Sequence, residues 1–186
     1  GLDSEWSAVG FIGRLNYSLN DIYLLQANVR ADGSSMFAKG NRWGVFPSVS
    51  LGWRFSNEKF MRNVKWLSNG KFRVGWGLLG NNRIDVLSRY TYLTSGFNYS
   101  YGLGNETMWE GSTATVLGNN DIKWEKSRNL NIGVDLGFFN NRLTATIEYY
   151  NRLTTDMLLR VPTVSSAGLN SSPMTNAGDV KNYGWE

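Results

Sequence analysis

The chain of 186 residues contains neither cysteine nor histidine. Without these two residue types it has no disulfide framework, no thiol nucleophile, no serine–histidine triad and no zinc site of the usual ligand types. Hydrolytic and thiol redox chemistry are therefore disfavoured. The sequence predicts a protein that is not an enzyme and that needs no cofactor or metal ion.

Long apolar runs and runs of like charge are also missing. Mean hydropathy is −0.34, and no apolar run approaches the ~18 residues that a membrane-spanning helix requires. The net charge of +4 comes from 19 basic and 15 acidic residues spread along the chain, without the basic stripe that follows a nucleic-acid backbone. A transmembrane helix is excluded and nucleic acid is disfavoured as a partner, but transmembrane β-strands stay open.

What the chain does contain is a regular alternation of apolar and polar residues. Six segments of about ten residues carry aliphatic, aromatic, glycine or proline residues on one face and all of their charges on the other. They are residues 9–17, 23–32, 45–55, 71–78, 129–138 and 142–152. A seventh segment begins between Asn176 and Glu186. This pattern predicts an all-β protein of antiparallel strands.

The connections between these strands alternate in length. Residues 19–21 and 139–142 are tight and 57–69 is intermediate, whereas 33–44, 81–122 and 157–175 are long. If consecutive strands are antiparallel, every long connection falls at one end of the sheet, as in outer-membrane barrels with short periplasmic turns and large external loops. The alternative is a soluble β-sandwich in which two such apolar faces pack together.

About seven strands cannot form a closed barrel. Bacterial barrels have even numbers of strands from eight upward, and an open sheet edge in lipid leaves backbone groups unsatisfied. The chain also begins GLDSEWSAVG, without an initiator methionine or an export signal, and stops inside a predicted strand. We therefore expect residues 1–186 to be a partial transmembrane β-barrel domain that is not closed by itself.

Several segments, in order along nearly the whole chain, resemble the SusC/RagA family of TonB-dependent outer-membrane receptors of Bacteroidota. They are 13–18 (GRLNYS), 30–35 (RADGSS), 41–44 (NRWG), 46–50 (FPSVS), 75–81 (GWGLLGN), 124–127 (WEKS), 131–135 (NIGVD) and 182–186 (NYGWE). One departure is that Tyr183 and Trp185 stand where the family more often has a basic and an aliphatic residue.

The resemblance implies an internal part of a barrel of about 22 strands, whose plug domain and remaining strands lie elsewhere in the protein. It implies a location in the cell outer membrane as a multi-pass β-barrel, in contact with outer-membrane lipid. It further implies import of oligosaccharides or peptides, driven through the TonB complex, with a SusD-like surface lipoprotein over the external loops. The alternative function is a soluble β-sandwich or adhesin-like binding module without a transport role.

Two groups of residues are candidates for contacts. The predicted external loops mix aromatic rings, amides and a guanidinium, a composition that stacks on sugars or packs on a protein partner, although loops also use such residues for their own folding. These loop residues are Arg42, Trp43, Tyr99, Tyr101, Asn105 and Trp109. The polar face supplies charges expected to line the lumen, where they face the plug domain, water or one another. These lumen residues are Arg14, Arg30, Arg54, Arg73, Asp135, Glu148 and Arg152.

Three acidic groupings are weak candidates for chemistry. The run 32–35 (DGSS) offers oxygen ligands but lacks EF-hand spacing, so a hydrogen-bonded turn is the favoured interpretation. Glu106 with Glu110, and Asp121 with Glu125, have the residue types of a glycosidase pair, but solvated loop charges explain them more simply. The sequence predicts neither a metal site nor a catalytic residue.

Overall fold

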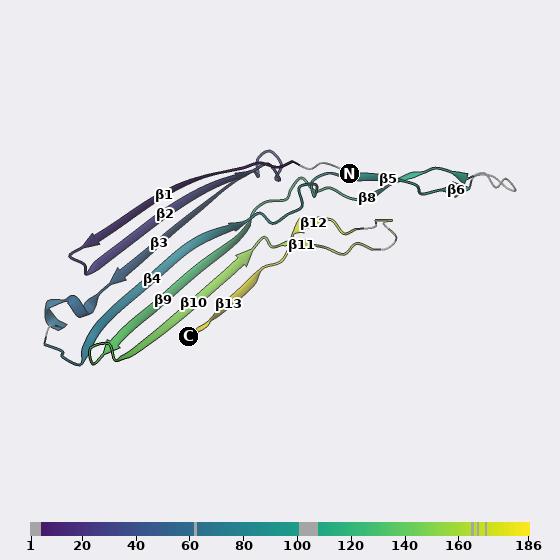
Figure 1. Cartoon of the computed structure of the whole chain (residues 1–186). Coiled ribbons are helices and arrows are strands. Elements are labelled where there is room, and N and C mark those ends of the chain that lie inside the picture. Colours follow the sequence, from purple (N-terminus) through teal and green to yellow (C-terminus); the bar gives the residue numbers. More distant parts are fainter. Residues whose placement is uncertain (1–4, 62, 101–107, 165, 167, 170) are drawn as a thin grey trace.

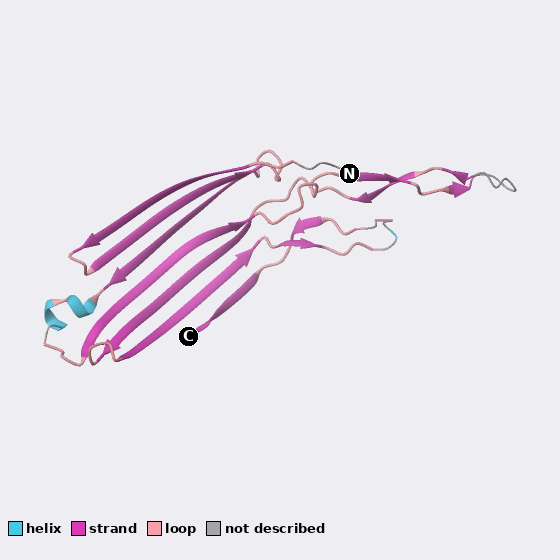
Figure 2. Cartoon of the chain, viewed as in Figure 1, coloured by secondary structure: helices cyan, strands magenta, loops and turns pink. Residues whose placement is uncertain are grey.

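The computed structural model describes residues 5–61, 63–100, 108–164, 166, 168–169 and 171–186. Its main element is an antiparallel seven-stranded sheet in the order β1-β2-β3-β4-β9-β10-β13, and this sheet is a single layer (Figures 1 and 2). The strands are β1 (Ala8–Leu19), β2 (Tyr23–Ser34), β3 (Trp43–Trp53), β4 (Leu67–Asn81), β9 (Glu125–Phe138), β10 (Leu143–Thr155) and β13 (Val180–Trp185). The all-β prediction is confirmed, and the sheet is open at β1 and β13.

The strand registers carry each face across the whole sheet. One row is apolar on all seven strands: Tyr17, Leu25, Leu51, Val74, Ile132, Tyr149 and Trp185. Another row holds polar residues and glycine: Arg14, Asn28, Ser48, Gly77, Asn129, Arg152 and Asn182. Because side chains alternate along a strand, these rows define an outer, apolar face and an inner, polar face.

The separation of the two faces is less complete than the sequence predicts. Ile12, Leu24, Phe46 and Leu79 lie at inner-face positions. Strand β9 begins at Glu125 rather than at residue 129, which brings Lys126 and Arg128 onto the outer face. Apolar residues therefore also occupy part of the inner face, and the outer face carries charge at the start of β9.

The connections fall at the two ends of the sheet in the predicted order, although 54–66 is longer than 35–42 at the opposite end. Residues 20–22, 54–66 and 139–142 join strands at one end of the sheet, called here the short-turn end. Residues 35–42, 82–124 and 156–179 join them at the other, the long-loop end (Figure 1). The tight turns place Asn20, Asp21 and three consecutive residues from Phe139 to Asn141 at positive φ, a region that asparagine and aspartate tolerate better than most residues.

The connections contain secondary structure of their own. Residues 54–66 include two 3₁₀ turns, η1 (Phe55–Asn57) and η2 (Lys59–Met61). In the longest loop, β5 (Tyr92–Ser95) pairs with β8 (Ser112–Val116), and β6 (Tyr99–Ser100) pairs with β7 (Met108–Trp109), forming an arm that projects from the sheet (Figure 1). Strands β11 (Leu158–Arg160) and β12 (Met174–Asn176) form a second, shorter hairpin.

The buried apolar core is small and lies at the long-loop end. Trp124 stacks on Phe37 with ring centroids 5.0 Å apart and meets the edge of Phe46 at 5.4 Å, and Ile122 completes the cluster. By contrast, outer-face side chains such as Leu15, Leu51 and Ile147 are more than half exposed. No helix in the described part of the chain is both long and apolar enough to cross a membrane.

Candidate functional site

Three of the predicted lumen residues meet at the centre of the inner face. Arg73 on β4 donates to Glu148 on β10 (Nη2 to Oε2, 2.6 Å), and its Nε lies 3.2 Å from Asp135 Oδ2 on β9. The guanidinium crosses Gly133, where a Cβ would lie 3.0 Å from Arg73 Cζ. One cation thus joins three neighbouring strands, and glycine leaves the space that it occupies.

Two other predicted lumen arginines belong to the polar row. Arg14 Nε donates to Asn28 Oδ1 (2.9 Å), and Asn28 Nδ2 donates in turn to Ser48 Oγ (3.3 Å). On the same inner face, but between β9 and β10, Arg152 Nε donates to Asn129 Oδ1 (2.8 Å). Arg54 lies between β3 and η1 at the short-turn end rather than within a strand. Much of the inner face is therefore hydrogen-bonded within itself.

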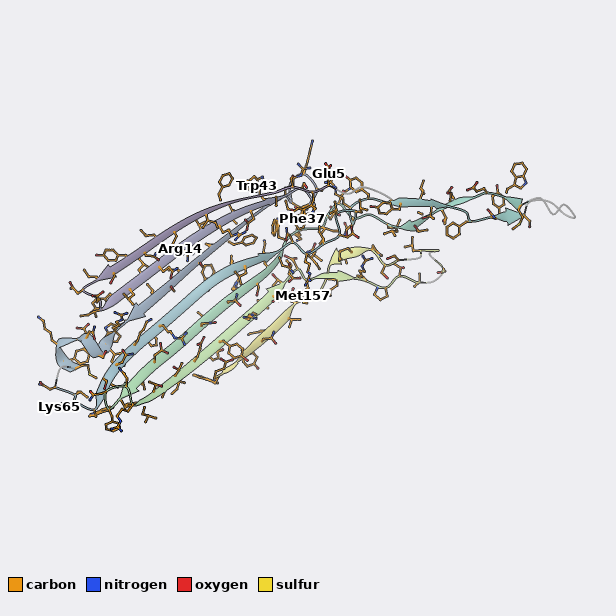
Figure 3. The ribbon with its side chains drawn as sticks, viewed as in Figure 1. Glu5, Arg14, Phe37, Trp43, Lys65 and Met157 are labelled. Atoms are coloured by element: carbon orange, nitrogen blue, oxygen red, sulfur yellow. The ribbon has the colours of Figure 1, made fainter. Side chains whose placement is uncertain are left out.

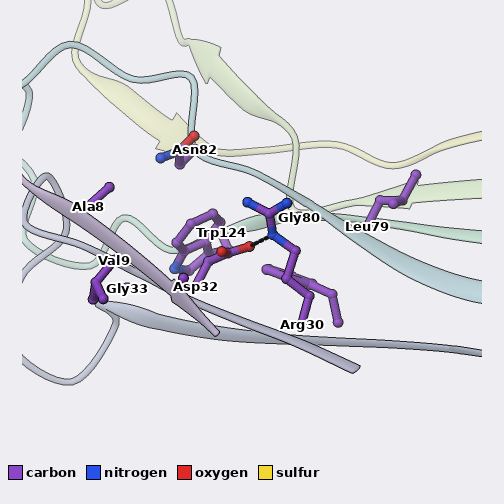
Figure 4. A pocket seen from close by; sticks show the side chains of 11 residues that line it. Ala8, Val9, Arg30, Asp32, Gly33, Leu79, Gly80, Asn82 and Trp124 are labelled. Carbon is purple, nitrogen blue, oxygen red and sulfur yellow. Dashed lines mark hydrogen bonds and ion pairs between the residues drawn. The ribbon is translucent and has the colours of Figure 1, made fainter. Parts of the chain in front are cut away.

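Arg30 and Asp32 form an ion pair on the inner face near the long-loop end (Nε to Oδ2, 2.5 Å). They line a cleft of about 410 Å³ together with Leu79, Asn82 and Trp124 (Figure 4). The Asp32 carboxylate is thus bound by a guanidinium, and the buried Ser34 hydroxyl accepts from the Met36 amide (3.3 Å). Within the described ranges no three carboxylate, thiol or imidazole side chains come together as metal ligands.

The two candidates of the first long loop have different surroundings. Arg42 is half-buried, donates through Nε to the Phe37 carbonyl (3.3 Å) and accepts at its own carbonyl from Trp124 Nε1 (3.2 Å). Trp43 lies at an outer-face position, 56% exposed, and stacks on Phe11 with centroids 6.2 Å apart. Arg42 thus helps to fold the loop, and Trp43 faces away from the lumen (Figure 3).

The arm carries the aromatic candidates that the structure describes. Tyr99 and Trp109 are paired across β6 and β7 and are 55% and 56% exposed. Phe97 and Gly111 exchange two backbone hydrogen bonds between the β5–β8 and β6–β7 pairings. Tyr101, Asn105 and Glu106 lie outside the described residues. Of the weak acidic candidates, Glu110 is exposed.

The structure adds a joint between the three long loops that the sequence analysis missed. Asn176 Nδ2 donates to the carbonyls of Lys123 (2.9 Å) and Asp156 (2.7 Å), and its Oδ1 accepts from the Lys123 amide (2.9 Å). Asn41 Nδ2 donates to the Ile122 carbonyl (3.2 Å). Segment 119–125 is therefore the point where the loops meet.

Glu125 belongs to the same joint. Its Oε1 accepts from Asn81 Nδ2 and its Oε2 from the Leu158 amide, both at 3.1 Å. These contacts give the carboxylate a role in holding β4 and β11 next to β9. These contacts explain the position of Glu125 without a catalytic pair between Glu125 and Asp121. Asp121 is exposed.

A further polar contact lies over the outer face at the short-turn end. The Tyr23 hydroxyl donates to Glu58 Oε1 (2.6 Å), and Trp53 Nε1 donates to the same oxygen (3.2 Å). The hydrogen bond from Tyr23, followed by that from Trp53, lowers the pKa of the Glu58 carboxyl. Tyrosine and tryptophan in this arrangement fit the aromatic girdle of a membrane barrel, where one end of the ring is apolar and the other is polar.

Comparison with known proteins agrees with this architecture. The family described as TonB dependent receptor-like, beta-barrel matches residues 4–186. TonB-dependent receptor SusC of Bacteroides thetaiotaomicron is 40% identical over 96% of the chain. TonB-dependent receptor P39 of Formosa agariphila is 34% identical over 100% of it. The chain spans only 18% and 17% of the length of these two relatives.

Solved structures match as well. The RagAB peptide transporter superposes with a TM-score of 0.83 at 33% identity, over 97% of this chain and 19% of that one. The RagAB peptide importer in its closed-closed state gives a TM-score of 0.84 over the same shares. With a family match over almost its entire length, the chain belongs to the TonB-dependent receptor β-barrel family and is of the SusC/RagA type.

Proposed function

We propose that residues 1–186 form part of the barrel wall of an outer-membrane importer of the SusC/RagA type. The observation that carries this proposal is the single-layer sheet with an apolar outer face across all seven strands. Soluble monomers rarely expose contiguous apolar patches above a few hundred Å², whereas a lipid bilayer requires such a face. The β-sandwich alternative needs a second sheet over this face, and the described residues contain none.

The open edges support the proposed domain organisation. β1 and β13 each have an unpaired edge, which is unstable in lipid because its N–H and C=O groups have no partner. In this proposal further strands pair with both edges and close a barrel of about 22 strands, with a plug domain inside. The inner-face charges then face the plug or the water-filled lumen.

Substrate and partners are proposed from the relatives. The RagAB structures are described as those of a peptide transporter and a peptide importer with closed and open states. We extend to this protein the import of peptides or oligosaccharides, energy supplied through TonB, and a SusD-like surface lipoprotein as partner. The loops at the long-loop end, including the arm with Tyr99 and Trp109, are where ligand and lipoprotein would first be met. No bond of the substrate is made or broken.

The placement is tested by fractionation of cells that produce the full-length receptor. We expect the protein in the outer-membrane fraction and in solution only with detergent. A receptor that stays monomeric and soluble without detergent would contradict the proposal.

The role of the arm is tested with Tyr99→Ala/Trp109→Ala in the full-length receptor, with Arg152→Gln as the comparison. We expect the double variant to weaken capture of peptide or glycan, or co-purification of the lipoprotein, more than the lumen variant does, because stacking on exposed rings contributes about 0.5–1.5 kcal/mol per pair. Unchanged capture and co-purification would leave these rings a role only in folding the arm.

A further inference from the structure

The charged residues of the seven strands are divided unequally between the two faces. In the described sheet, three charged strand residues occupy outer-face positions: Lys126 and Arg128 on β9 and Lys181 on β13. All three are basic, exposed and at the long-loop end. Every carboxylate of the described strands is on the inner face, as Asp32, Glu125, Asp135 and Glu148 illustrate.

The three cations are close together because strand pairing aligns them. Arg128 and Lys181 flank the same residue of β10, Leu153, from its two sides, and Lys126 pairs with the next outer-face residue of β10, Thr155. Adjacent strands are about 4.8 Å apart, so the cations occupy neighbouring positions on one small area. The Lys181 ammonium lies 5.6 Å from the centroid of Tyr183, the next outer-face residue of β13.

This area lies where the apolar band ends. On β10 the outer face runs from Leu143 to Leu153 with Asn151 as its one polar residue. This stretch is about 33 Å along the strand, which a tilt of about 40° reduces to roughly 25 Å, the height of the apolar band of a membrane barrel. Leu153 is therefore at the rim of the apolar band nearest the long-loop end, and Arg128 and Lys181 lie beside it. A cation on the lipid face is most costly at the midplane and nearly free at the interface.

We propose that Lys126, Arg128 and Lys181 form a binding site for the phosphate groups of a lipid in the leaflet at the long-loop end. This inference rests on the proposed placement in the outer membrane. None of the three takes part in a salt bridge within the described residues, and Leu153 and Tyr183 provide apolar contacts for the acyl chains beneath the headgroup. The basic residues match the phosphate groups of a lipid, and the apolar residues beside them match its acyl chains.

The test uses the full-length receptor, delipidated in a nonionic detergent and titrated with lipid A in mixed micelles. The variant is K126M/R128M/K181M. The matched control is R14M/K71M/R152M, which removes the same charge from the inner face, where Lys71 of β4 pairs with Asp135. A basic residue near an anionic headgroup strengthens binding about fivefold, so the outer-face variant should bind lipid A on the order of a hundredfold more weakly. The control should bind as the unmodified receptor does.

Two further arms separate the sources of the effect. Dephosphorylated lipid A should bind the unmodified receptor as weakly as lipid A binds the outer-face variant, and inorganic phosphate should not compete at equal concentration. Thermal unfolding without lipid checks the fold, and we expect the outer-face variant to be at least as stable as the unmodified receptor. Equal binding of lipid A by variant and receptor, or displacement by free phosphate, would overturn the site. A receptor that needs no detergent would instead overturn the proposed function itself.

Discussion

At the scale of single residues, the face on which a side chain lies decides its environment. Ser50 and Leu51 are neighbours on β3, yet Ser50 belongs to an inner-face row and Leu51 to the outer apolar row between Leu25 and Val74. Leu51 is 54% exposed within the described sheet. A charge placed at these two positions therefore enters water in one case and lipid in the other.

Leu51→Arg is expected to lower the free energy of unfolding of the reconstituted receptor by about 2–4 kcal/mol, the cost of a cation on the lipid face near the midplane. Ser50→Arg places the same side chain one residue away, on the inner face, and should cost much less. Ser50 pairs with Gly75 of β4, which has no side chain, and even a Cβ added to Gly75 would be 4.0 Å from Ser50 Cβ, so there is space for the arginine. Denaturant unfolding in vesicles measures both. Equal losses would contradict the assignment of the faces.

Glu58 gives stability a pH dependence. Its carboxyl has a pKa below the ordinary 4.5 because Tyr23 and Trp53 donate to the ionised form. A carboxyl of this kind contributes stability fully above its unfolded pKa, and the contribution is lost as pH falls through the lower, folded value. We expect the receptor to unfold at a higher temperature than Glu58→Gln near neutral pH, and the difference to shrink as the pH falls below 4.5 and through the lower pKa of the folded state. A difference that stays constant with pH would rule out this linkage.

At the scale of elements, the long loops are organised by hydrogen bonds between them. The Asn176 amide joins the β11–β12 hairpin to segment 119–125, and Asn119 Nδ2 donates to the Met174 carbonyl (3.1 Å) in the same direction. The arm and the shorter hairpin are two-stranded, and such ribbons are marginally stable alone. Their mutual contacts are therefore part of what keeps them folded.

Asn176→Ala is expected to speed amide hydrogen exchange at residues 119–125 and 156–160 while leaving β1 and β2 unchanged. The Lys123 amide loses its acceptor, and an unpaired polar group costs about 1–3 kcal/mol where it is shielded from water. Exposed Asn98→Ala on the arm is the control and should change neither segment. Unaltered exchange at Lys123 in the Asn176 variant would show that the joint does not depend on this amide.

At the scale of the whole molecule, the sorted connections define an orientation in the membrane. Lys65 is exposed at the short-turn end (Figure 3). Glu110 is exposed on the arm at the long-loop end. Barrels of this kind have their short turns in the periplasm and their large loops outside the cell.

In intact cells, Glu110→Cys is expected to react with a membrane-impermeant thiol reagent and Lys65→Cys to stay unlabelled until the cells are opened. No native cysteine in residues 1–186 interferes. Labelling in the reverse order would invert the topology.

The sequence by itself determined the strands, their faces and the order of short and long connections, because a period of two and turn-forming residues are local properties. It also brought Arg73, Asp135 and Glu148 to one face, since all three follow the same alternation. It did not predict the arm, whose strands are two to five residues long and too short to show a period.

Only the tertiary structure decided which residues meet across the sheet and between the loops. Asn176 contacts Lys123, and Trp124 packs on Phe37, through a joint between segments that are far apart in the sequence. The cluster of Lys126, Arg128 and Lys181 likewise appears only once strand register is fixed. Register is set by pairing between strands, and a shift of one residue would exchange the two faces. Contacts of this kind depend on how distant segments align, and local periodicity carries no information about that alignment.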